Sequence, residues 1–118
     1  MLDDVYSFKL NALAALAEPN RLLIVELLRK GPRPVGEIAS KLHLNQPQVS
    51  KHLRVLSDAG VVQVRPIAQQ RVYNLRPQAF RELDDWLESY RRLWDDRHDR
   101  LNDYLRKAQK EKKNGRTN

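Results

Sequence analysis

Residues that break helices divide the first 60 positions into four short segments, and this division limits the fold more than any other sequence feature. The breaks fall at Pro19, Gly31-Pro32, His43-Leu44 and Gly60. Proline removes a helical hydrogen bond, and glycine adopts the left-handed conformation in which helices commonly end. We therefore expect a small domain of short helices here instead of one or two long ones.

Apolar residues recur at helical spacing within each of these segments. The spacing predicts helices at 5–16, about 19–30, about 34–42 and about 46–59. The fourth has the clearest boundaries. Asn45 can cap its N-terminus, Pro47 falls in its first turn, and Gly60 follows its last residue.

Two runs rich in β-branched and aromatic residues follow the fourth helix, at 61–65 and 71–75. Such runs are typical of strands, so we expect a β-hairpin. The connecting residues 66–70 contain neither glycine nor an Asn-Gly pair. Tight two-residue turns favour those residues, and we therefore expect a more open loop.

A single helix is predicted from Pro77 to about residue 105, because its apolar residues alternate in steps of three and four. A helix with such a stripe needs a second apolar surface, and another copy of the same helix is the simplest supplier. The predicted domain spans 1–105, and 106–118 is expected to be a frayed, basic tail. The expected dimer interface comprises Val5, Phe8, Leu83, Leu87, Tyr90, Trp94, Leu101 and Tyr104.

The charge of the chain is uneven. The formal net charge is +7, and residues 21–76 carry ten basic and three acidic side chains, whereas residues 77–105 carry five basic and eight acidic ones. A basic region of this kind attracts polyanions, and nucleic acid is the leading candidate partner.

The fourth helix would present a polar, positive face to such a partner. At about 100° per residue, Val49, Leu53 and Leu56 fall on one side, and the polar residues point elsewhere. Glutamine matches the major-groove edge of adenine, and arginine binds guanine or phosphate through two N–H groups. The expected DNA-binding residues on this helix and the hairpin are Gln46, Pro47, Gln48, Ser50, Lys51, His52, Arg54, Arg65, Gln69, Gln70 and Arg71.

Four stretches of the chain together resemble ArsR-type transcriptional repressors. They read LAALAEPNRLLIVELL at 13–28, VGEIA at 35–39, QPQVSKHLRVL at 46–56 and AGVV at 59–62. The resemblance covers about residues 12–105, in the order and spacing of the family.

This resemblance implies a mainly α fold with a small β-hairpin. The fold would be a winged helix-turn-helix of order α-α-α-α-β-β-α that dimerises through its terminal helices, with the fourth helix in the major groove. The implied function is that of a sequence-specific repressor of its own or a neighbouring operon, acting as a homodimer on a pseudo-palindromic operator.

Many members of this family sense metals, but the expected ligands are incomplete here. The chain has no cysteine, which excludes thiolate sites. Of the family's zinc pattern on the last helix, Asp96 and His98 match, whereas Gln109 and Lys112 stand where a histidine and a carboxylate are needed. We therefore expect no metal and no other cofactor, as in the cysteine-free branch of the family, and the inducer stays open.

Other function classes make distinct predictions. A nonspecific architectural DNA-binding protein would also be basic, but it would not prefer one sequence over random DNA. A protein-interaction module would use the long helix alone. An enzyme is not expected, because the chain has no glycine-rich phosphate loop and no nucleophile motif. The absence of a long apolar run and of a signal-peptide pattern predicts a cytoplasmic location.

Overall fold

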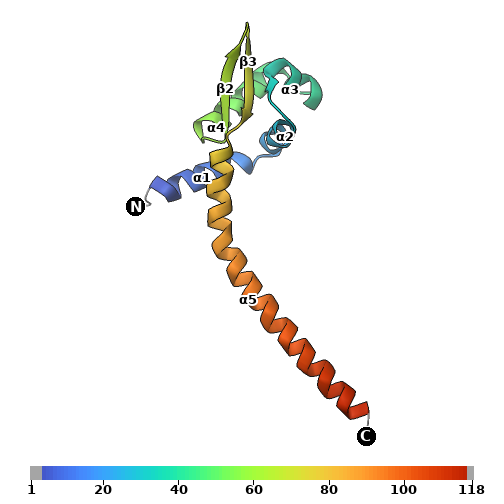
Figure 1. Cartoon of the computed structure of the whole chain (residues 1–118). Coiled ribbons are helices and arrows are strands. Elements are labelled where there is room, and N and C mark those ends of the chain that lie inside the picture. Colours follow the sequence, from blue (N-terminus) through green and yellow to red (C-terminus); the bar gives the residue numbers. More distant parts are fainter. Residues whose placement is uncertain (1–3, 117–118) are drawn as a thin grey trace. The chain divides into compact units, whose positions relative to one another are not determined.

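The computed structural model describes the backbone of residues 4–116 and their side chains except those of residues 4, 5, 94, 96–99 and 113–116. The chain divides into two compact units, Met1–Leu83 and Asp84–Asn118. The elements of Figure 1 are, in order, α1 (Asp4–Leu16), α2 (Pro19–Leu28), β1 (Arg33–Pro34), α3 (Val35–Leu42), α4 (Gln46–Asp58), β2 (Val62–Ile67), β3 (Gln70–Leu75) and α5 (Pro77–Arg116).

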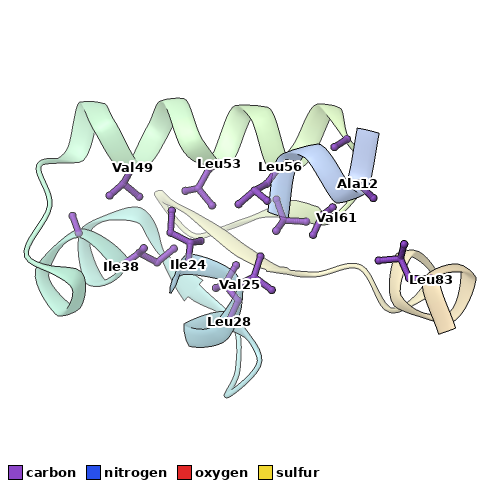
Figure 2. Packing of buried hydrophobic residues seen from close by; sticks show 14 residues of the cluster. Ala12, Ile24, Val25, Leu28, Ile38, Val49, Leu53, Leu56, Val61 and Leu83 are labelled. Atoms are coloured by element: carbon purple, nitrogen blue, oxygen red, sulfur yellow. The ribbon is translucent and has the colours of Figure 1, made fainter. Parts of the chain in front are cut away.

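The core of the first unit forms around the inner face of α4. Figure 2 shows the side chains of Val49, Leu53 and Leu56 on this helix, directed toward Ile24 of α2 and Ile38 of α3. All five side chains are fully buried. Completely burying one such side chain stabilises a fold by about 1.5–3 kcal/mol. The inner face therefore fixes which side of α4 is turned to solvent.

The expected boundaries of α4 are confirmed. The side chain of Asn45 accepts a hydrogen bond from the backbone N–H of Gln48, at 2.9 Å. Gly60 follows the helix with a φ of 76°, and the N–H of Val61 returns to the carbonyl of Leu56 at 2.9 Å. This is the bonding pattern of a glycine-terminated helix.

The hairpin is confirmed, but its loop is not open as expected. Strand pairing continues to Ile67 opposite Gln70, so only Ala68 and Gln69 connect β2 and β3. Ala68 has a φ of 56°, the sign that a tight hairpin turn of type II′ requires at its first loop residue. Glycine is preferred at that position but not required, and a left-handed conformation costs alanine about 1–2 kcal/mol.

A short strand that the sequence analysis missed completes the sheet. β1 pairs antiparallel with β3, with Arg33 opposite Tyr73 and Pro34 opposite Val72, and the sheet has the order β1-β3-β2. Proline is tolerated there because β1 lies at the edge of the sheet. Two residues are too few to show the alternation by which strands are recognised in a sequence.

The last helix is longer than expected. α5 continues to Arg116, so the segment expected to be a frayed tail from residue 106 is helical. Residues 105–112 are Leu, Arg, Lys, Ala, Gln and Glu, all of which have high helix propensity. The basic charge of this segment suggested a solvated tail, whereas the high helix propensity of its residues explains why it is helical.

Candidate nucleic-acid interface

The outward face of α4 is polar and open to solvent. Six of the residues expected to bind DNA lie on this face and are exposed, namely Gln46, Pro47, Gln48, Ser50, Lys51 and Arg54. They begin at the helix N-terminus, where unpaired backbone N–H groups favour anions. The first turns of α4 thus offer hydrogen-bond donors, acceptors and positive charge on one surface.

A tight connection holds α4 against α3. His43 ends α3 in the left-handed conformation, with a φ of 56°, and the N–H of Leu44 donates to the carbonyl of Ala39 at 3.0 Å. Asn45 then caps α4. Only three residues separate the two helices, so the packing of α3 against the core also sets the direction of α4.

The cationic side chains of this region form no ion pairs among the described residues. Within the part of the chain that the structure describes, no ion pair involves Lys51, Arg54, Arg65 or Arg71. All four residues are exposed. Their charges are therefore available to an external anion.

An open groove lies between α4 and the sheet, with a volume of about 480 Å³. Lys51 and Arg54 line it from α4, and Arg71 lines it from β3. Asp58 at the end of α4 contributes one carboxylate. The sequence predicted Lys51 and Arg54 on the fourth helix and Arg71 on the hairpin, and the structure brings all three to one groove.

The tip of the hairpin carries the other expected contacts. Gln69 lies in the two-residue turn, Gln70 begins β3, and Arg65 lies on β2 opposite Val72. All three polar residues are exposed. They extend the polar surface from α4 along the hairpin.

His52 lies apart from this surface. Only 18% of its side chain is exposed, and its Nδ1 is 3.7 Å from Oε2 of Glu18. The same Glu18 oxygen accepts the backbone N–H of Arg21 at 2.8 Å and so caps α2. This hydrogen bond, together with the nearby His52 and Arg21, lowers the pKa of Glu18. The contact with Glu18 gives His52 a role within the fold.

Of the two α1 residues expected at a dimer interface, the structure describes the side chain of Phe8 alone. Phe8 is half-buried, and its ring lies close to Gly60 of the same unit, since a Cβ at Gly60 would be 3.1 Å from it. The side chain of Val5 lies outside the described residues. The exposed apolar residues of α1 are instead Tyr6, Leu10 and Leu13. Their spacing of four and three was present in the sequence and could have identified them.

The α5 residues expected at the interface are mostly exposed. Leu83 is the exception, because it is 8% exposed and belongs to the core. The side chain of Trp94 lies outside the described residues. Exposed apolar residues of this helix are Leu87, Tyr90, Leu93, Leu101, Tyr104 and Leu105, of which Leu93 and Leu105 were not expected.

Neither a metal cluster nor a membrane-spanning helix is found among the described residues. No group of three or more His, Asp or Glu side chains is arranged to hold a metal ion there. The side chains of Asp96 and His98, which match part of the family's zinc pattern, are not among those described. No described helix has an apolar stretch long enough to cross a bilayer.

A short helix packed beneath an exposed basic helix, followed by an antiparallel hairpin, defines a winged helix-turn-helix DNA-binding protein. The profile described as "Bacterial regulatory protein, arsR family" matches residues 18–64. The chain belongs to the ArsR family of transcriptional regulators, whose members bind DNA and are not enzymes.

Individual relatives agree with this assignment. HTH-type transcriptional regulator Rv2034 of Mycobacterium tuberculosis is 43% identical over 76 residues, which cover 64% of this chain and 71% of the relative. The biofilm growth-associated repressor of Agrobacterium fabrum is 43% identical over 63 residues, covering 53% of this chain and 54% of the relative. The crystal structure of an ArsR family transcriptional regulator superimposes with a TM-score of 0.68 at 25% identity, covering 80% of this chain and 97% of that one.

Proposed function

We propose that this regulator is a repressor that binds a pseudo-palindromic operator as a homodimer and blocks the promoter of its own or a neighbouring operon. One observation carries the proposal: the outward face of α4 holds polar and cationic side chains with no partner among the described residues. A relative named as a repressor supports repression of transcription over activation. The site of action is the cytoplasm, where the operator DNA of a bacterium lies.

Three residues of the α4 face have roles that follow from their chemistry. Gln48, in the first turn, reads adenine through paired donor and acceptor groups. Lys51 contacts phosphate and contributes affinity without sequence information. Arg54 binds guanine or phosphate, and its place in the groove beside Arg71 favours a DNA backbone running between α4 and the hairpin.

The second copy would be held by the exposed apolar residues of the terminal helices. Leu87, Tyr90, Leu101 and Tyr104 on α5 are between 44% and 70% exposed. Burying such a stripe against its own copy removes apolar surface from water and places two α4 helices on one operator. Two recognition helices on one duplex require half-sites about 34 Å apart.

Substitutions on α4 test the division between base and phosphate contacts. Gln48→Ala should weaken binding to a duplex recovered from a random pool by about 1–3 kcal/mol and relax the preference at one base pair, because a base contact is lost. Lys51→Ala should weaken all sequences alike and reduce the salt dependence of binding. Affinities on matched and mismatched duplexes at two salt concentrations provide the measurement.

Lys30→Ala is the matched control for these variants. Lys30 is exposed in the turn after α2 and does not line the groove, so its removal tests the effect of charge alone. Wild-type affinity and base preference for both Gln48→Ala and Lys51→Ala would refute the assigned contacts. Competition binding with the wild-type protein distinguishes the second function class. Random DNA should compete with the selected duplex as well as the duplex itself if the protein is a nonspecific architectural one. A sequence-specific repressor should prefer its site by about a thousandfold or more.

A further inference from the structure

A second hollow of the first unit lies between α1, α2 and the end of α4, and no residue of the hairpin lines it. It is an open pocket with a volume of about 400 Å³. Its apolar lining comprises Ala14 and Ala15 of α1 together with Val55 and Ala59 at the end of α4. Pockets that bind small molecules have volumes of about 300–1,000 Å³. The size of this pocket therefore suits a small molecule.

The apolar part of the pocket is hollow because its innermost side chains are small. Ala15 and Ala59 are 2% and 9% exposed and belong to the core, and each fills only the space of a methyl group. Val55 has a larger side chain and is 41% exposed. Apolar surface is thus left open to a ligand at this place.

Two side chains of opposite charge line the same pocket. Arg21 comes from α2 and Asp58 from the last turn of α4, and Asn11 of α1 adds an amide. Among the described residues, neither Arg21 nor Asp58 forms an ion pair. The pocket therefore offers both a cation and an anion to a ligand.

The guanidinium of Arg21 is held at the pocket by the fold. Its Nε donates to the carbonyl of Ala15, near the end of α1, at 2.6 Å. No hydrogen bond of its two terminal nitrogens is found in the part of the chain that the structure describes. Arg21 helps to lower the pKa of Glu18, but Glu18 caps α2 and does not line the pocket. Arginine N–H groups in this state suit a carboxylate, which accepts two of them in parallel.

Asp58 lines two sites at once. Besides the pocket, it lines the groove between α4 and the sheet, beside Lys51, Arg54 and Arg71. In that groove its carboxylate repels the DNA phosphates that the three cations attract. A cation that binds Asp58 from the side of the pocket would remove this repulsion.

We propose that the pocket binds a small zwitterion, an α-amino acid with an apolar side chain, which strengthens DNA binding as a corepressor. The carboxylate of the ligand pairs with Arg21, its ammonium group pairs with Asp58, and its side chain covers Val55. The inference rests on the proposed DNA-binding function and adds the chemical class of the effector. Because coupling between two sites is reciprocal, bound DNA strengthens amino-acid binding by the same factor.

Direct binding without DNA tests the class of ligand. The full chain is titrated with valine, leucine, isoleucine and phenylalanine in a calorimeter, and at least one of them should bind saturably. Matched compounds that lack one charge should bind at least about tenfold more weakly, because one charge pair is lost. For leucine these are isocaproate and isoamylamine. Absence of saturable binding by all four amino acids, or equal binding of the compounds that lack a charge, would overturn the inference.

The coupling to DNA is measured on the selected duplex with and without the amino acid. The amino acid should raise the affinity of the wild type about fivefold or more. Asp58→Asn should bind the duplex more tightly than the wild type without the amino acid, and should not respond to it. Ala14→Leu fills the pocket and should also lose the response. Ala17→Leu is the matched control, because Ala17 is exposed just after α1 and outside the pocket, and it should keep the response.

The outcomes separate this inference from the proposed function. Wild-type protein that binds the selected duplex but gains no affinity with the amino acid would overturn the inference and leave the proposed function standing. A response retained by Ala14→Leu would place the amino acid elsewhere and overturn the assignment of the pocket. Saturable amino-acid binding by a protein that binds no duplex would overturn the proposed function and the corepressor role together.

Discussion

His43 shows how a single residue in the turn limits stability. It ends α3 with a φ of 56°, a conformation that costs a residue with a side chain about 1–2 kcal/mol and glycine almost nothing. The sequence predicted the end of α3 at this residue, but not its left-handed conformation. Histidine gives no strong sign of that geometry, whereas Gly60 did at the end of α4.

We predict that His43→Gly raises the free energy of unfolding by up to about 1 kcal/mol. Glycine relieves the backbone strain of the left-handed conformation, but its greater conformational entropy in the unfolded chain cancels part of that gain. Chemical denaturation of wild type and variant measures the change. Lys41→Gly, within the last turn of α3, is the control and should lower stability by about the same amount. A destabilised His43→Gly would show that the histidine side chain contributes more than its backbone costs.

Glu18 makes the free energy of unfolding depend on pH in the acidic range. The N–H of Arg21 and the nearby charges lower its pKa in the folded state. The unfolded chain therefore takes up the proton more readily, and the stabilisation is present above the ordinary glutamate pKa and is lost as pH falls through the lowered one.

Glu18→Gln should accordingly be less stable than wild type near neutral pH, and the difference should shrink in acid. Denaturation at about pH 6 and about pH 3 measures it. Glu26→Gln, on the exposed side of α2, controls for the loss of one carboxylate. A difference that grows in acid would contradict the assigned cap.

The ends of a helix were predictable where the sequence contains a residue that caps or terminates helices. Asn45, Pro47 and Gly60 located α4 correctly, because each acts through its own backbone or side chain. The turn of the hairpin and strand β1 depend instead on pairing with residues distant in the sequence. Local preferences do not contain that information.

The Asn45 cap of α4 should contribute measurably to the free energy of unfolding. Asn45→Ala removes the acceptor for the Gln48 N–H and should lower the free energy of unfolding by about 1 kcal/mol. Asn45→Ser, which keeps an acceptor, should lose much less. Thermal or chemical denaturation separates the two variants, and equal losses would mean that the side-chain hydrogen bond does not support α4.

For the whole molecule, the sequence indicated the order of elements and the face of α4 that is turned to solvent. It did not show that Lys51, Arg54 and Arg71 line one groove, since their meeting depends on the packing of α4 against the sheet. Nor did it show that the Phe8 ring lies close to Gly60. Such contacts are properties of the packed unit.

In the proposed complex the outward face of α4 binds DNA twice, through two copies of the chain. Footprinting on a duplex selected from a random pool tests it most directly. We predict two protein copies per duplex and protection of two inverted half-sites centred about 10–10.5 base pairs apart. A single copy protecting one unsymmetrical site, or the same footprint after the outward side chains of α4 are replaced by alanine, would contradict the claim.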